Sequence, residues 1–124
     1  MGNLDAVRDW GYAPEYVEAM WRMLQHDEPD DFVVATGTSY TVRDFLELSF
    51  GHVGLDYRDY VRFDERYLRP TEVDALIGDF GKAQDRLGWT PKVLTPRLAQ
   101  IMVEADQAAL AVEGSRYVDA VQTA

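Results

Sequence analysis

Two stretches of the sequence decide how the fold is interpreted: Gly2-Asn3-Leu4-Asp5-Ala6-Val7-Arg8-Asp9-Trp10-Gly11 and Tyr67-Leu68-Arg69-Pro70-Thr71-Glu72-Val73-Asp74. Each contains an arginine, and in the second stretch Glu72 follows the arginine three positions later. Pro70 disfavours helix in the residue before it, so the backbone of Arg69 is restrained to an extended or turn conformation. An arginine fork matches phosphate oxygens bidentately, and a carboxylate can accept hydrogen bonds from a ribose diol. These are the residue types that a site for a nucleotide diphosphate requires.

The same arginines have carboxylates nearby in the sequence, so surface ion pairs are the alternative: Arg8 with Asp5 or Asp9, and Arg69 with Glu72 or Asp74. Exposed ion pairs of this kind are common and contribute little to stability. Asn3 also has two interpretations, because an asparagine can contact a sugar or a base, or can satisfy backbone groups in a turn. Spacing alone leaves these alternatives open.

Composition limits both the fold and the partners. The 124 residues are 47% hydrophobic and 27% charged, which is typical of one globular domain. The formal net charge is −10, so most of the surface should repel a polyanion, and nucleic acid is not an expected partner. An anionic ligand would therefore need local basic side chains. The chain has no cysteine, no apolar run long enough to cross a membrane and a polar start, which favours a cytoplasmic location.

Hydrophobic spacing predicts mostly helices. Residues 14–25 place four apolar side chains at the spacing of an amphipathic helix, with Pro14 suited to its first turn: Val17, Met20, Trp21 and Leu24. Thr41 and Asp44 resemble a capping box that opens a second helix, which Gly54 stops. Two further helices are predicted at 79–87 and from 95 to about 112.

Local signals mark the ends of the third helix and suggest some extended structure. Asp79 can cap the helix at 79–87, and Gly88 can close it. Two short strands are predicted, at 32–35 and, less regularly, at 60–63. Three aromatic side chains are expected to pack in the core: Trp10, Trp21 and Trp89.

Several stretches taken together resemble the GDP-mannose 4,6-dehydratase family of the extended short-chain dehydrogenases/reductases: Gly2 to Gly11, Glu15 to Trp21, Asp27 to Gly37, Arg69 to Asp74, and Leu87 to Lys92. The resemblance runs from Gly2 to about Val112. It implies an α/β fold in which residues 1–112 form a small nucleotide-sugar-binding domain of mixed helices and short strands, with the Rossmann half absent. Residues 113–124 lie outside the resemblance and are predicted to form a flexible tail.

The resemblance also implies roles for single residues. The family arginines that match Arg8 and Arg69 hold the diphosphate of GDP-mannose, and the glutamate that matches Glu72 holds the guanosine ribose. Asn3 is a further candidate for contact with the sugar or the base. Val7 departs from the family pattern, since many members carry a basic residue just before the arginine. No residue of this chain is given a catalytic role.

The family reaction needs groups that this sequence does not contain. NADP oxidises C4 of the bound mannose, water leaves C5 and C6, and hydride returns to C6, giving GDP-4-keto-6-deoxymannose. A Rossmann phosphate loop and a tyrosine-lysine pair are required, yet there is no G-x-G-x-x-G loop, and neither Lys82 nor Lys92 follows a tyrosine by four residues.

From this resemblance we expect NADP to be bound by an absent N-terminal Rossmann half, the isolated chain to be an inactive part of a lyase, and the parent enzyme to be a homo-oligomer. The alternative is a non-enzymatic nucleotide-sugar-binding or interaction module with the same fold.

Other candidate chemistry is weaker. His26 and His52 have no metal-ligand spacing around them, and the acidic loop at 27–31 lacks the glycine and terminal glutamate of a calcium loop, so no metal site is predicted. Ser49 and His52 share a helical turn, but no third orienting residue is evident, so they are not assigned as a nucleophile pair.

Overall fold

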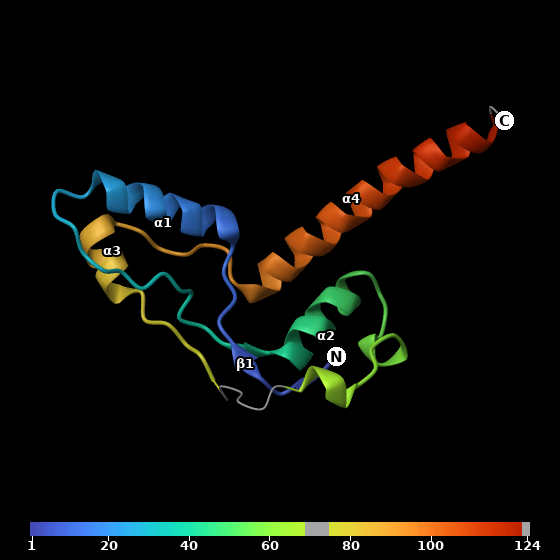
Figure 1. Ribbon diagram of the computed structural model, residues 1–124, viewed down its shortest axis with the longest axis horizontal. Helices are drawn as coiled ribbons and strands as arrows, with labels where there is room; N and C mark the ends of the chain where they lie inside the picture. The colour runs from blue at the N-terminus through green and yellow to red at the C-terminus, as the bar shows by residue number, and fades with distance from the viewer. Residues whose placement is uncertain (69–74, 123–124) are drawn as a thin grey trace.

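The computed structural model describes residues 1–68 and 75–122, and only the backbone of residues 113–122. Its elements follow in the order β1 (Val7–Arg8), α1 (Ala13–Gln25), β2 (Tyr40–Thr41), α2 (Val42–His52), the 3₁₀ turns η1 (Tyr57–Asp59) and η2 (Glu65–Tyr67), α3 (Gly81–Leu87) and α4 (Thr95–Gln122). In Figure 1, α1 and α3 lie together at one end of the molecule, and β1 and α2 lie toward the other. Helix α4 projects away from both toward the C-terminus (Figure 1).

The predicted first helix is confirmed as α1, with a proline in its first turn. Its buried side is not the predicted one. Ala19 is fully buried against Ala83 and Trp89 of the α3 region, whereas the predicted apolar stripe is largely exposed, at 61%, 60%, 62% and 81% for its four members: Val17, Met20, Trp21 and Leu24. The spacing correctly predicted a helix but gave the wrong buried face, because α1 carries apolar side chains on both faces.

The capping box that begins α2 is confirmed. The Thr41 hydroxyl accepts from Asp44 N at 3.0 Å, and the Asp44 carboxylate accepts from Thr41 N at 2.8 Å, so each residue satisfies a backbone donor of the other. Gly54, with φ of +73°, follows the end of the helix as predicted. Helix α2 packs against α4, and His52 Nε2 lies 3.2 Å from a carboxylate oxygen of Glu104 across this contact.

The two predicted strands are wrong. Residues 32–35 are extended, with Val33 54% exposed and Ala35 buried, but no neighbouring strand pairs with them among the residues described. The exposure of Val33 and the lack of a pairing strand both contradict the short buried strand that the apolar run predicted. At 60–63, Tyr60 N and Val61 N donate to the carbonyl oxygen of Tyr57 at 3.0 and 2.9 Å, so a turn uses the donors that a strand would need.

The last two helices begin and end largely as predicted. The Asp79 carboxylate accepts from Gly81 N at 2.8 Å at the start of α3, and Gly88, with φ of +63°, closes that helix. Trp89 follows and is 1% exposed, which confirms its predicted place in the core. Helix α4 begins at Thr95 as predicted but continues to Gln122, beyond the predicted fading of the pattern.

Trp10 is partly buried against Phe45, with ring centroids 5.1 Å apart, so this aromatic side chain packs as expected. Trp21 does not. Among the described residues, no helix combines the length and the apolar character that crossing a membrane requires.

Candidate functional site

Arg8 lies in β1, where its antiparallel partner across the sheet is Tyr40. The side chain is partly buried, and Nη1 donates to the Val7 carbonyl oxygen at 2.7 Å. The carboxylates that the sequence offered as ion-pair partners are engaged elsewhere. Asp5 accepts from the guanidinium of Arg43 at 2.9 and 3.2 Å, and Asp9 accepts from backbone N–H groups of distant residues. The surface ion pair with these two carboxylates is therefore not the arrangement that the structure favours.

The segment that carries Arg69 and Glu72 lies outside the described residues, and so does the ion pair predicted between them. The chain just before it is fixed against the N-terminal stretch. Gly2 approaches η2 so closely that a Cβ on Gly2 would lie 2.6 Å from the carbonyl oxygen of Tyr67. The residues just before the segment with Arg69 and Glu72 therefore lie beside the N-terminal stretch that contains Asn3.

The chain just after the segment is fixed against β1. Ala75 forms a parallel bridge with Val7, and Leu76 N donates to the Val7 carbonyl oxygen at 3.4 Å. Strand β1 thus has β2 as one neighbour and the chain at Ala75 as another. The described residues on either side of the segment, Tyr67 and Ala75, therefore both lie against the N-terminal stretch that contains Asn3 and Arg8.

Asn3 is exposed, and its side-chain oxygen accepts from Asp5 N at 2.9 Å. This bond closes a turn of the kind that asparagine forms with its own backbone two residues on. The turn interpretation of Asn3 is therefore confirmed, and its contact with a sugar or a base remains a prediction.

An open hollow of about 660 Å³ adjoins the same region. It is lined by a short set of residues from the N-terminal stretch and η2: Met1, Gly2, Arg66, Tyr67 and Leu68. Its volume is within the range of about 300–1,000 Å³ that is common for small-molecule sites. Arg66 brings a cation to this hollow, although the carboxylate of Asp64 pairs with it at 2.6 Å.

Asp9 is a residue of this region whose role the sequence analysis missed. Its carboxylate accepts from the backbone N–H groups of Thr36 and Gly37, and from that of Gly78 at 3.4 Å. These partners are 27, 28 and 69 positions away. No local signal reveals such contacts, so a carboxylate beside an arginine was taken for its ion-pair partner.

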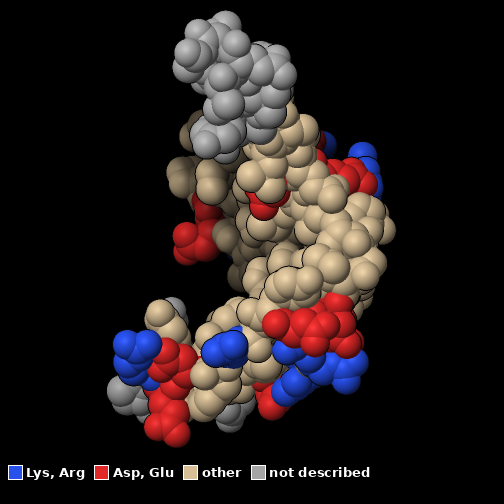
Figure 2. Space-filling view, turned by 90° about the vertical axis from the view of Figure 1, so that its right-hand side faces the viewer, with Lys and Arg blue, Asp and Glu red and all other residues tan. Residues whose placement is uncertain are grey.

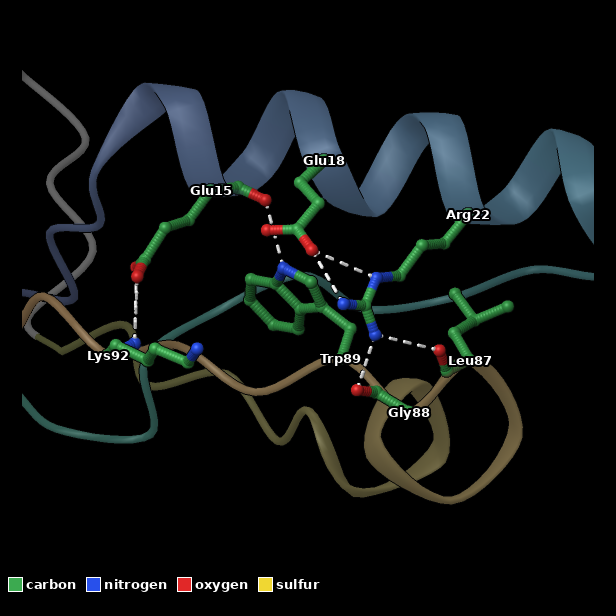
Figure 3. A network of polar contacts seen from close by, with 7 residues as sticks. All are labelled: Glu15, Glu18, Arg22, Leu87, Gly88, Trp89 and Lys92. Carbon is green, nitrogen blue, oxygen red and sulfur yellow. Dashed lines mark hydrogen bonds and ion pairs between the residues drawn. The ribbon is translucent and has the colours of Figure 1, made fainter.

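A second polar network joins α1 to the chain around α3 (Figure 3). Trp89 Nε1 donates to the Glu15 carbonyl oxygen at 2.9 Å, and the Glu15 carboxylate accepts from Lys92 N at 3.0 Å. Arg22 donates to the Leu87 carbonyl oxygen at 3.1 Å and pairs with a carboxylate oxygen of Glu18 at 2.6 Å on its own helix. These side chains form hydrogen bonds with backbone groups and with one another, so the network stabilises the fold.

The described charges are mostly organised in local pairs. On the face shown in Figure 2, basic and acidic side chains lie next to one another and do not form a broad patch of one sign. Burial raises the pKa of Tyr16 above its usual value, and the carboxylates of Asp9 and Glu15 raise it further, so the phenol is neutral at physiological pH. Hydrogen bonds that the Arg43 guanidinium donates to the Tyr57 hydroxyl and the Asp5 carboxylate raise the pKa of Arg43.

The weaker candidates from the sequence are held in structural contacts. Ser49 Oγ donates to the Phe45 carbonyl oxygen at 2.8 Å, and His52 faces Glu104 on α4, so the two residues do not form a nucleophile pair. Among the side chains that the structure describes, in residues 1–68 and 75–112, no group of three or more histidine, aspartate or glutamate residues is arranged to hold a metal ion.

Solved structures show the class to which this fold belongs. UDP-glucose 4-epimerase from Thermotoga maritima, solved with UDP-glucose, matches with a TM-score of 0.78 and 27% identity over 89% of this chain and 34% of that chain. The fold is also that of dTDP-glucose 4,6-dehydratase from Bacillus anthracis in complex with NAD, with a TM-score of 0.74 and 16% identity over 86% of this chain and 33% of that chain. The class is that of the extended short-chain dehydrogenase/reductase epimerases and dehydratases.

Sequence comparison identifies the family within this class. The family profile for GDP-mannose 4,6 dehydratase matches residues 1–102. GDP-mannose 4,6 dehydratase 1 from Arabidopsis thaliana is 58% identical over 106 residues, which cover 86% of this chain and 29% of that protein. The chain belongs to the GDP-mannose 4,6-dehydratase family, as the resemblance implied. It spans about a third of the length of the curated relatives that it matches.

Proposed function

We propose that this chain is the substrate-binding portion of a GDP-mannose 4,6-dehydratase, the lyase that converts GDP-mannose to GDP-4-keto-6-deoxymannose. The observation that carries the proposal is the placement of β1. Arg8 lies on this strand, and Ala75, just beyond the segment with Arg69 and Glu72, is bridged to its neighbour Val7. This bridge supports the proposal, because it ties the chain just beyond the segment with Arg69 and Glu72 to the strand that carries Arg8.

In this proposal the chain binds and orients the nucleotide, and other parts of the parent enzyme act on the sugar. Arg8 and Arg69 hold the diphosphate, since a planar guanidinium can donate two parallel hydrogen bonds to phosphate oxygens. Glu72 accepts from the ribose hydroxyls, and Asn3 lies at the edge of the same region. The overall charge of −10 makes these local cations necessary, because the field of the whole chain repels an anion.

The described residues do not fit NADP. A dinucleotide site of this class needs a parallel sheet and a glycine-rich loop that runs from a strand into the start of a helix. The sheet of the described chain consists of two antiparallel strands of two residues each, and the sequence has no G-x-G-x-x-G loop. We therefore assign NADP to a separate N-terminal Rossmann half of the parent enzyme, and we derive no catalytic step from this chain.

The exposed face of α1 supports the existence of such a partner. A helix normally buries its apolar side chains against a neighbour, and α1 has apolar side chains beyond the face that meets the core. Ala19 and Met23 of α1 face the core around Trp89, while Val17 and Trp21 on the other side are 61% and 62% exposed. In the parent enzyme we expect further polypeptide, most simply the N-terminal half, to cover this second face.

Titration of the isolated chain with GDP, followed by amide NMR, tests the proposed site. Because only part of the pocket is present, we expect a dissociation constant on the order of millimolar, which corresponds to about 4 kcal/mol. The shifts should concentrate at residues 2–8 and 66–76. Guanosine, which lacks the diphosphate, is the matched control ligand and should bind more weakly. No shifts at saturating GDP, or shifts scattered away from these residues, would remove support for the proposal.

A further inference from the structure

The carboxylate of Asp9 joins three separate segments of the chain. Asp9 follows Arg8 directly. Its Oδ1 accepts from Thr36 N at 3.0 Å and from Thr36 Oγ1 at 2.5 Å, and its Oδ2 accepts from Gly37 N at 3.0 Å and from Gly78 N at 3.4 Å. One side chain therefore connects the end of β1, the loop before β2 and the chain that leads into α3.

The loop at Thr36 and Gly37 is shaped to receive this carboxylate. Gly37 has φ of +71°, a left-handed conformation that favours glycine, and consecutive backbone N–H groups in such a turn form a concavity that binds anions. Thr36 is 4% exposed, and its hydroxyl also accepts from Thr38 N at 3.2 Å. The anion held in this concavity is the side chain of Asp9.

The third segment is locked at Gly78. A Cβ at this position would lie 2.2 Å from the Cβ of Ala35, so only glycine allows the chain to pass this close. Three residues earlier, Ala75 is bridged to Val7. The described chain that follows Glu72 is thus held onto the β1 region at two points, by backbone pairing at Ala75 and by the carboxylate of Asp9 at Gly78.

We propose that Asp9 is a positioning residue of the nucleotide site: its carboxylate holds the end of β1, directly after Arg8, against the loop at Thr36 and Gly37 and the chain at Gly78. This inference rests on the proposed function. A bidentate grip on phosphate depends on the position and angle of the guanidinium group, so a shift of β1 against these segments moves Arg8 and weakens binding. Asp9 itself touches no substrate in this account.

Asp9→Asn is the test, because the asparagine amide replaces one acceptor oxygen with a donor that faces the N–H groups of the loop. Glu15→Gln is the matched control. The Glu15 carboxylate also accepts from two backbone N–H groups far away in the sequence, those of Lys92 and Val93, at 3.0 and 3.2 Å. It does so between α1 and the chain that joins α3 to α4, so it measures the effect of losing a carboxylate that stabilises the fold without joining the segments that Asp9 joins.

The measurement is the affinity for GDP, from the NMR titration, together with the melting temperature of wild type, Asp9→Asn and Glu15→Gln. We expect both variants to lower the melting temperature and only Asp9→Asn to weaken GDP binding, by about tenfold. The amide shifts of residues 7–8 and 75–78 should also move in Asp9→Asn without ligand. Should Asp9→Asn fail to fold, Thr36→Val removes one of its hydrogen bonds and should weaken GDP binding by a smaller factor.

Two outcomes would overturn the role of Asp9 while leaving the GDP site in place. One is an affinity of Asp9→Asn for GDP that lies within twofold of the wild-type affinity. If Thr36→Val has to be used instead, the corresponding result is an affinity for GDP equal to that of wild type. The other is an equal loss of affinity in Asp9→Asn and Glu15→Gln, which would show that Asp9 acts through stability alone. Absence of GDP binding by the wild type is a different result, since it overturns the proposed function and this inference with it.

Discussion

Trp89 Nε1 donates a hydrogen bond to the backbone carbonyl of Glu15 at 2.9 Å, across 74 positions of the sequence. The indole also packs edge-on against Tyr16, with ring centroids 5.9 Å apart. Through these contacts the first turn of α1 is attached to the chain between α3 and α4. Trp89 is the largest fully buried side chain among the described residues, so the stability of this end of the molecule should depend on it.

Trp89→Ala should destabilise the chain by about 3–5 kcal/mol, since it removes a buried aromatic ring and leaves a cavity. Trp21→Ala is the matched control, because this indole is 62% exposed and its loss should change stability by less than about 0.5 kcal/mol. Urea unfolding of both variants measures the difference. Equal losses would mean that Trp21 is packed in the isolated chain.

The exposed face of α1 also predicts how accessible each tryptophan is to a fluorescence quencher. Acrylamide should quench the fluorescence of Trp21 readily and that of Trp89 poorly, as they are 62% and 1% exposed. Trp21→Phe should therefore remove most of the quenchable emission, whereas Trp89→Phe should remove emission that is shielded. Addition of the separately produced N-terminal half should protect Trp21. If acrylamide quenches Trp21 equally with and without the N-terminal half, then that half does not cover the exposed face of α1.

The capping box of α2 predicts a dependence of stability on pH. Hydrogen bonds from the backbone and side chain of Thr41 hold the pKa of Asp44 below its usual value of 3.8. A lowered folded-state pKa means that this stabilisation is present at pH above the unfolded value and is lost as pH falls below about 4 through the folded value. Loss of such a cap costs about 1 kcal/mol.

Asp44→Asn should therefore lower the free energy of unfolding at pH 7 and make little difference at pH 2.5. Asp85→Asn serves as the control, because this carboxylate is exposed on α3, away from the start of α2. Urea unfolding of the three proteins at both pH values makes the comparison. A loss for Asp44→Asn that is the same at both pH values would show that the carboxylate does not act through its ionised form.

Local chemistry explains why most helices could be predicted. Pro14 fits the first turn of α1, the Thr41 and Asp44 pair begins α2, and Gly88 closes α3, and each of these signals lies within a few residues of the end that it sets. Distant partners explain the errors. The apolar run at 32–35 is typical of a short strand, but a strand exists only if another strand pairs with it.

The same distinction applies to the candidate site. Arg8 was proposed through a resemblance that runs from Gly2 to about Val112, because its local surroundings suggested a surface ion pair as well. Asp9 was missed, since its partners at Thr36 and Gly78 are 27 and 69 positions away. Trp21 was assigned to the core because periodicity gives the apolar face of a helix without giving what covers that face.

The isolated chain should show no dehydratase turnover, since it lacks the residues that would position NADP. Incubation with GDP-mannose and NADP, with detection of the 4-keto sugar, checks this expectation. The control is the same reaction after the separately produced N-terminal half is added, which should restore product. Sustained turnover by the pure chain alone would contradict the division of roles proposed here.

The most direct test of the central claim is the affinity of Arg69→Lys for GDP. Lysine keeps the charge but loses the planar fork, so a bidentate grip on the diphosphate should weaken by about 1.5–3 kcal/mol, roughly ten- to a hundredfold. Arg58→Lys is the matched control, because the exposed Arg58 pairs with Asp56 on the surface, at 2.7 Å, and its replacement should leave GDP affinity unchanged. Affinity lost in Arg69→Lys and retained in Arg58→Lys is the result that we predict. Affinity for GDP that is the same in wild type and in Arg69→Lys would contradict the nucleotide-binding role.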